Sequence, residues 1–131
     1  MLLNPSPVQK LPGELIGLLD GVIVNRDEAR ALADALAPVP HVVTTLGADG
    51  ARASGPDGEV STPGFAVDVV DTTGAGDAFA GAFAASWHLP AAERLRRADA
   101  AGALTATAPG AAAAPTAADV DAFLAAQETA R

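Results

Sequence analysis

The segment Asp71–Asp77 reads Asp-Thr-Thr-Gly-Ala-Gly-Asp and combines two glycines, two hydroxyl side chains and two carboxylates. An apolar β-branched run precedes it and a helical composition follows it, which predicts a strand, a tight loop and a helix start. The first amide N–H groups of a helix have no partners within that helix, and glycine lets the backbone approach an anion closely. The sequence therefore predicts an anion site at Gly74, Ala75 and Gly76.

The carboxylate of Asp77 suggests that this site does more than bind a phosphate, because a carboxylate repels an anion. It suits a site in which Asp77 takes a proton from a hydroxyl while the amides hold the charge of a phosphoryl group. A Gly-rich turn with Asp77 as a helix N-cap accounts for the same residues. The loop alone favours neither interpretation. A Walker A loop is absent, and a dinucleotide fingerprint would need glycine where Phe79 stands.

The elements that must position this loop are marked by proline and glycine punctuation. Hydrophobic periodicity and β-branched runs predict helices over 11–19, 26–37, 77–87, 91–107 and 116–127, strands over 21–24, 41–46 and 66–70, and a hairpin joining 51–54 to 59–62. Asn25 is expected to cap the second helix, and Thr116 with Asp119 is expected to form a capping box.

The order of these elements predicts the fold class. The strand, helix and strand over 21–46 predict a parallel strand pair, and the hairpin predicts an antiparallel edge. We therefore expect an α/β fold with an open, mostly parallel sheet in a single domain over residues 1–131.

Composition excludes several classes of protein. The 131 residues include 8 Lys and Arg against 16 Asp and Glu, a formal net charge of −8, which argues against a nucleic-acid or anionic membrane surface. The absence of cysteine excludes disulfides and thiolate sites. No signal peptide or apolar span is evident, so we expect a soluble, cytoplasmic protein.

The segment from Asp71 to Ala82 resembles the second signature of the ribokinase family of carbohydrate kinases, also called the phosphofructokinase-B family. Further matches occur in the family's order and approximate spacing, at residues 4–7, 24–28, 44–50 and 107–111. The resemblance covers essentially the whole chain and implies a ribokinase-like, three-layer open sheet. It also implies an ATP-dependent sugar kinase, with ribose as the favoured substrate.

The resemblance assigns a role to the loop residues. Asp77 would be the general base that deprotonates the sugar hydroxyl, and Gly74, Ala75 and Gly76 would form the anion hole for the transferring phosphoryl group, with Gly76 and Asp77 also adjoining ATP.

The resemblance also implies a set of nucleotide-binding residues. Asn25 and Glu28 match the family's Asn-x-x-Glu motif, which organises Mg²⁺ and phosphate largely through water. An ordinary N-cap with its acidic partner explains the same pair. The residues that would line the nucleotide are Thr45, Gly47, Ala48, Asp49 and Gly50, although a turn after a strand explains them too. Asp99 would lie on the adenine side.

A monovalent-cation site, suited to K⁺, is a further implication. Its ligands would be the Asp71 carboxylate and main-chain carbonyl groups, since oxygen ligands suit a hard cation. The positions involved are Asp71, Thr73, Thr105, Ala108, Gly110 and Ala114, where Ala114 replaces a serine of the family.

The family pattern implies a longer protein than this chain. Complete kinases of the family are more than twice this long, and their first half supplies most sugar contacts and a lid. The chain is therefore expected to be the C-terminal half of such an enzyme, without the lid and the N-terminal half. The alternatives are a truncated non-catalytic nucleotide-binding or partner module, which could pair with a separate first half or with another copy, and a remnant without function.

Overall fold

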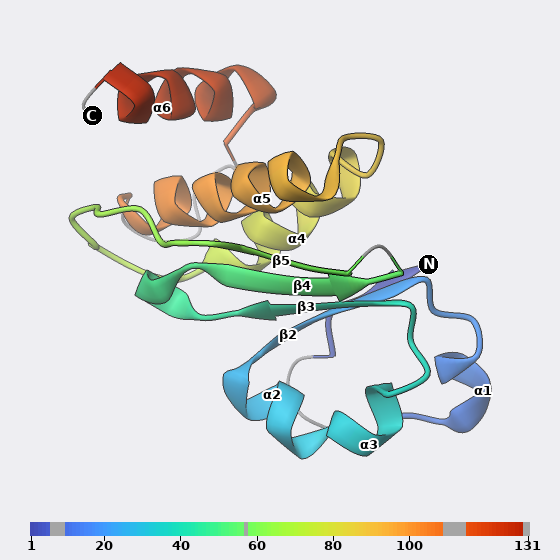
Figure 1. Ribbon diagram of the computed structural model, residues 1–131. Coiled ribbons are helices and arrows are strands. Elements are labelled where there is room, and N and C mark those ends of the chain that lie inside the picture. The colour runs from blue at the N-terminus through green and yellow to red at the C-terminus, as the bar shows by residue number, and fades with distance from the viewer. Residues whose placement is uncertain (6–9, 57, 109–114, 130–131) are drawn as a thin grey trace. The chain divides into compact units, whose positions relative to one another are not determined.

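The structure is a computed structural model that describes residues 1–5, 10–56, 58–108 and 115–129 (Figure 1). The chain divides into two compact units, residues 1–63 and 64–131.

The first unit is built on a five-stranded mixed sheet. Its strands follow one another across the sheet in chain order: β1 (Leu2–Leu3), β2 (Gly21–Asn25), β3 (His41–Thr45), β4 (Ala51–Gly55) and β5 (Gly58–Thr62). The first three are parallel, and β3, β4 and β5 are antiparallel. The expected parallel pair, the hairpin and the antiparallel edge are therefore confirmed.

Three short helices lie on one face of this sheet, α1 (Gly13–Ile16), α2 (Arg26–Ala31) and α3 (Ala33–Leu36) (Figure 1). Strand β2 is buried over its first four residues, as its unbroken β-branched run predicts. The core that β2 shares with the helices consists of Leu11, Leu19, Val22, Val24, Leu32, Leu36 and Val39. Burying one side chain of this size contributes about 1.5–3 kcal/mol, so this cluster is what holds the helices on the sheet.

Two of the expected helices are shorter than predicted. The helix expected over 11–19 is one turn, which begins after Pro12 and ends at Gly17. The helix expected over 26–37 breaks at Leu32, where φ is −108° and ψ is 10°. Leu32 and Leu36 both reach the same core, and no proline or glycine marks the break in the sequence.

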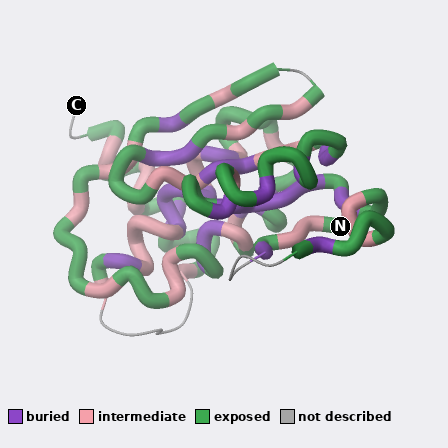
Figure 2. The backbone as a smooth tube through the Cα atoms, turned by 90° about the horizontal axis from the view of Figure 1, so that it is seen from below, coloured by how far each residue is buried: buried purple, intermediate pink, exposed green. Residues whose placement is uncertain are grey.

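The second unit is helical and contains α4 (Ala75–Ala85), α5 (Ala91–Ala106) and α6 (Ala117–Thr129). Small residues let α4, α5 and α6 approach one another around a cluster of Ala78, Ala100, Ala101 and Val120. Phe65 packs edge-on against Phe123 of α6, with ring centroids 5.1 Å apart. The buried residues of both units form short stretches along the backbone (Figure 2).

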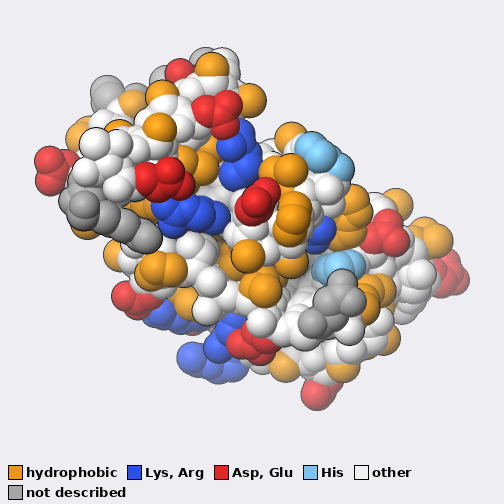
Figure 3. All heavy atoms as spheres, turned by 45° about the horizontal axis from the view of Figure 1, so that its top comes forward, with side chains coloured by type: hydrophobic (Ala, Val, Ile, Leu, Met, Phe, Trp, Pro, Cys, Tyr) orange, Lys and Arg blue, Asp and Glu red, His pale blue; other side chains and the backbone are white. Residues whose placement is uncertain are grey.

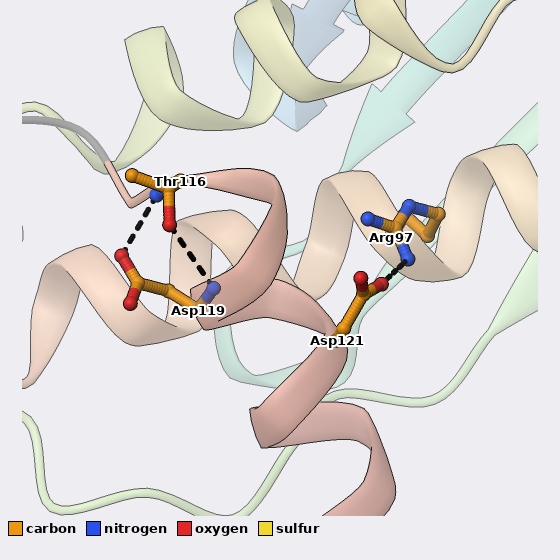
Figure 4. Close-up of polar contacts among 4 residues, drawn as sticks. All are labelled: Arg97, Thr116, Asp119 and Asp121. Atoms are coloured by element: carbon orange, nitrogen blue, oxygen red, sulfur yellow. Dashed lines mark hydrogen bonds and ion pairs between the residues drawn. The ribbon is translucent and has the colours of Figure 1, made fainter.

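Helix α6 begins with the expected capping box. The hydroxyl of Thr116 accepts from the amide of Asp119 at 3.1 Å, and the amide of Thr116 donates to the Asp119 carboxylate at 2.8 Å (Figure 4). The amide of Thr116, followed by its hydroxyl, acts on the Asp119 carboxylate and holds the pKa of Asp119 below its usual range. Two residues further along α6, Asp121 accepts a hydrogen bond from Arg97 of α5 at 2.6 Å, which ties α6 to α5 (Figure 4).

The prediction of a strand over residues 66–70 is wrong. The segment has no strand pairing; instead, the amides of Val70 and Asp71 both donate to the carbonyl of Ala106, at 2.8 and 3.1 Å. The side chains of Val69 and Val70 are exposed. β-Branched residues favour extended backbone, but a strand also requires a neighbouring strand to which it can hydrogen-bond. The local sequence does not show whether such a partner is present.

Charged side chains of both signs are mixed on one face of the molecule. On the face that Figure 3 shows, Lys and Arg side chains lie beside Asp and Glu side chains and do not gather into a basic patch. Among the residues that the structure describes, every helix is too short or too polar to cross a membrane.

Candidate functional site

The start of α4 is formed by Gly74, which has a φ of 81° and a ψ of −4°. This left-handed conformation favours glycine, and it turns the chain sharply into the helix. Gly74 is the N-cap residue and supplies no side chain, so the cap has no side-chain hydrogen bond. Asp77 is the third residue of the helix and is exposed. The interpretation of Asp77 as the N-cap is therefore wrong.

The first amides of α4 differ in what they bind. The amide of Ala75 donates to the carbonyl of Thr72 at 3.1 Å, and the amide of Ala78 donates to Gly74 at 2.9 Å. Within the described part of the chain, the amides of Gly76 and Asp77 have no backbone acceptor. The carboxylate of Asp77 likewise makes no hydrogen bond or ion pair with any described residue. The helix start thus offers two amide donors and one carboxylate side by side.

Helix α5 approaches this helix start closely at a second glycine, Gly102. A Cβ atom on Gly102 would lie 3.3 Å from the carbonyl oxygen of Ala75 and 3.8 Å from the Cβ of Phe79. A side chain there would push the start of α4 away. Gly102 was missed by the sequence analysis, because a lone glycine in an Ala-rich helix carries no local signal of a close approach.

The loop before α4 is fixed by Asp71. Its Oδ1 atom accepts from the amide of Thr73 at 2.9 Å and from the Thr73 hydroxyl at 2.6 Å. The Asp71 amide binds the carbonyl of Ala106, which places the loop against the last turn of α5. This brings four of the expected cation ligands into one region: Asp71, Thr73, Thr105 and Ala108.

The expected cation set is only partly described. Gly110 and Ala114 lie outside the described residues. The carbonyl of Thr105 accepts from the amide of Ala108 at 3.3 Å, so one lone pair is used within the helix end. The K⁺ site therefore stays a prediction.

Asp99 lies on α5 one turn before Gly102 and is buried. Its Oδ2 atom has no hydrogen-bond partner among the described residues. Burial raises the pKa of Asp99 to about 6, while the nearby charge of Arg96 acts in the opposite direction. The adenine-side role of Asp99 is untested.

In the first unit, Asn25 and Glu28 form a complete capping box at the start of α2. The side-chain oxygen of Asn25 accepts from the amide of Glu28 at 2.8 Å, and the carboxylate of Glu28 accepts from the amide of Asn25 at 2.9 Å. Glu28 is only 5% exposed. Both side chains therefore already satisfy the amides of this helix start.

The donors at this helix start limit how a metal could bind. Within residues 1–5, 10–56, 58–108 and 115–129, no three His, Cys, Asp or Glu side chains gather into a set that could hold a metal ion. Mg²⁺ in kinases is commonly held by one or two carboxylates together with phosphates and waters. The residues thus fit an ion that arrives on a nucleotide, and they do not fit a metal held by the protein alone.

The loop after β3 lies beside this helix start. Asn25 pairs with Thr45 across the parallel strands, and the Thr45 hydroxyl donates to the carbonyl of Val24 at 3.4 Å. The loop turns through Gly47 and Gly50, whose φ values are 59° and 97°, and closes with a 2.8 Å bond from the Leu46 amide to the Gly50 carbonyl. The structure therefore brings together the seven expected nucleotide residues of this unit, Asn25, Glu28, Thr45, Gly47, Ala48, Asp49 and Gly50.

Arg26 links the two parts of this group and was missed as a site residue. Its Nη2 atom lies 2.8 Å from Oδ2 of Asp49, across 23 positions of sequence. The opposite charges were visible in the sequence, but their pairing depends on the β2 and β3 register.

Comparisons with known proteins agree with this fold. The chain is 43% identical over 126 residues to an ATP-dependent ribose-1-phosphate kinase of Halopiger xanaduensis, covering 86% of this chain and 41% of that one. A ribokinase crystal structure from Thermotoga maritima matches with a TM-score of 0.83 and 29% identity, covering 95% of this chain and 48% of that one. A ribokinase-like Escherichia coli structure holding ATP and Mg²⁺ matches with a TM-score of 0.76 and 26% identity, covering 87% and 42%.

These matches confirm the ribokinase-like fold that the sequence implied. They also show that the chain spans less than half the length of each of these proteins. The family model for pfkB family carbohydrate kinases matches residues 1–118. The chain belongs to the pfkB family of carbohydrate kinases.

Proposed function

We propose that this chain carries the phosphoryl-transfer residues of an ATP-dependent sugar kinase, with Asp77 as the general base and ribose as the sugar. The observation that carries the proposal is the start of α4. It presents an exposed carboxylate beside the amides of Gly76 and Asp77, which lack acceptors among the described residues. Helix amides stabilise a phosphoryl anion, and a carboxylate can take a proton beside it.

The proposed reaction is an in-line displacement at the γ-phosphorus of ATP. The sugar hydroxyl oxygen forms a bond to phosphorus as the bond from phosphorus to the bridging oxygen of ADP breaks. The hydroxyl proton passes to the Asp77 carboxylate, and the electron pair of the broken bond stays on ADP. The amides of Gly76 and Asp77 hold the charge on the transferring group.

ATP binding is assigned to the group in the first unit, from Asn25 and Glu28 to the loop of residues 45–50. The two positive-φ glycines of that loop leave its backbone uncovered by side chains. Mg²⁺, when bound with ATP, would offset phosphate charge, with Glu28 acting on it through water.

A nucleotide-binding or partner module without catalysis is the second candidate. It is favoured by the coverage of 41% of the ribose-1-phosphate kinase, since residues beyond that share would contribute to a complete site. Catalysis and nucleotide binding, measured separately, distinguish the two candidates.

The first experiment tests catalysis. A chimera is made in which this chain replaces the segment of Thermotoga maritima ribokinase that it matches, and ribose-dependent ADP release is measured. Asp77→Asn should lower kcat by about 10²- to 10⁴-fold with little change in ATP affinity. Asp68→Asn, which alters another exposed carboxylate of the same unit, is the matched control and should leave kcat unchanged. Near-full activity of Asp77→Asn would refute the assigned role.

The second experiment tests nucleotide binding by the 131-residue chain itself. Calorimetric titration with ATP and Mg²⁺ should show weak binding. In a separate assay with ribose added, the same chain should show almost no sugar phosphorylation. A sample that is folded by circular dichroism yet gives no heat up to millimolar ATP would contradict nucleotide binding. Binding together with an inactive chimera would support the module instead.

A further inference from the structure

We infer that Arg26 is a positioning residue for the nucleotide, acting by neutralising Asp49 and holding its loop against the start of α2. This inference rests on the proposed ATP binding in the first unit. Neither the family match nor the motif residues assigns a role to Arg26.

The two segments to which ATP binding is assigned carry more negative than positive charge. The segments 25–28 and 47–50 contain one cation, Arg26, and three carboxylates, Asp27, Glu28 and Asp49. A region proposed to take the phosphates of ATP would be wholly anionic without Arg26. Glu28 is buried in the capping box, whereas Asp49 lies exposed in the loop itself. Asp27 is exposed as well, but Asp49 is the exposed carboxylate that lies in the proposed nucleotide loop and pairs with Arg26.

The ion pair of Arg26 and Asp49 joins these two segments. Nη2 of Arg26 and Oδ2 of Asp49 are 2.8 Å apart, although both side chains remain more than half exposed. The pair joins the residue directly after the N-cap Asn25 to the one-turn helix at Gly47–Asp49. It thus fastens the two segments to which ATP binding is assigned, at their solvent side.

The exposure of the pair decides what it can do. Exposed ion pairs contribute little to folding because water screens them and because ordering two long side chains costs entropy. A pair at the rim of a binding site instead affects the approach and affinity of a charged ligand, and salt weakens that effect. The structure therefore points to an effect of Arg26 on ATP that exceeds its effect on stability.

The test compares ATP with adenosine, which has the same base and sugar but no phosphates. Arg26→Gln should raise the Kd for ATP by about two- to five-fold at low salt, leave the Kd for adenosine unchanged, and lose its effect in high salt. Arg26→Lys keeps the charge and should restore ATP binding to within about two-fold of the original chain. Both measurements use calorimetry on chains checked for folding.

The double variant Arg26→Gln with Asp49→Asn separates neutralisation from direct contact. Removing both charges should lower the Kd for ATP below that of Arg26→Gln alone, because the repelling carboxylate is gone. A double variant as weak as Arg26→Gln would overturn the inference, since Arg26 would then be acting on the phosphates themselves.

A matched control exists in the β4–β5 hairpin. Arg52 pairs with Glu59 at 3.8 Å, and its side chain is 54% exposed, as is that of Arg26. Arg52→Gln should leave ATP affinity unchanged. An original chain that binds ATP while Arg26→Gln binds it equally well refutes this inference alone. A folded original chain that does not bind ATP refutes the proposed function, and this inference with it.

Discussion

The helices α2 and α4 begin in opposite ways. At α2, Asn25 and Glu28 satisfy the first amides with their own side chains, and Glu28 is buried in doing so. At α4, Gly74 supplies no side chain, and the amides of Gly76 and Asp77 find no acceptor among the described residues. The start of α2 is thus closed, because side chains bind its first amides. The start of α4 is open, because its amides at Gly76 and Asp77 lack such partners among the described residues.

This difference separates stability from ligand binding. A closed helix start contributes to folding, because the cap replaces hydrogen bonds that water would otherwise make. An open one leaves its amides and the positive end of the helix dipole available to an anion. Helix α6, with its capping box of Thr116 and Asp119, resembles α2 in this respect. Helix α5 also starts without a side-chain cap, because its N-cap Pro90 makes no side-chain hydrogen bond. What distinguishes the start of α4 is the left-handed glycine at its N-cap, Gly74.

The largest effect on the free energy of unfolding is expected at the open start of α4. Gly74→Ala forces a Cβ atom into a conformation with φ of 81°, which should lower the free energy of unfolding by about 1–2 kcal/mol. The measurement is urea unfolding followed by circular dichroism. Gly76→Ala is the matched control, since a Cβ there meets nothing within 4 Å, and it should be neutral or stabilising by up to about 1 kcal/mol. Equal losses in the two variants would mean that the turn at Gly74 is not strained by a side chain.

The next effect is expected at the closed start of α2. Asn25→Ala removes the cap and should cost about 1 kcal/mol of unfolding free energy in the same assay. Asn25→Asp keeps an oxygen acceptor and should retain most of the stability. A neutral Asn25→Ala would erase the contrast between α2 and α4.

A smaller effect on the free energy of unfolding is expected from Asp77→Asn. Because Asp77 caps nothing at α4, the substitution should change the unfolding free energy by less than about 0.5 kcal/mol, while it strongly lowers kcat in the chimera. A thermal melt beside the rate assay measures both. A large loss of stability would show that the α4 start depends on this carboxylate, as the α2 start depends on Glu28.

The smallest effect is a pH dependence at α6. The Thr116 amide and hydroxyl lower the pKa of Asp119 in the folded chain below its value in the unfolded chain. The stabilisation is therefore complete above the unfolded value of 3.8 and is lost as pH falls through the folded pKa. Comparing melts of the original chain and Asp119→Asn from pH 6 downward should show two curves that converge at acid pH. Curves that stay parallel would contradict the role of the cap.

Much of this architecture could be predicted from local sequence. The caps at Asn25 and Thr116, the β4–β5 hairpin and the parallel pair of β2 and β3 all depend on residues close together in the chain. The open helix start at Gly74 to Asp77 was predicted as a loop and an anion site, although its helix begins two residues earlier than expected.

The errors have one physical origin. The strand expected over 66–70 failed because a strand depends on a partner, and the break at Leu32 reflects packing into a core rather than a local stop signal. The pair of Arg26 with Asp49 and the close approach at Gly102 also depend on how distant segments meet. Local patterns carry none of these tertiary contacts.

The surroundings of Trp87 have a spectroscopic consequence. The chain has one tryptophan and no tyrosine, and Trp87 lies in the second unit, with its ring 5.9 Å from the Phe83 ring and 4.5 Å from the guanidinium carbon of Arg94. Indole emission therefore reports on the surroundings of Trp87, whereas far-ultraviolet circular dichroism reports on the backbone of both units. Superimposable denaturation curves from the two signals would mean that the units unfold as one cooperative system, and separated curves would give each unit its own stability.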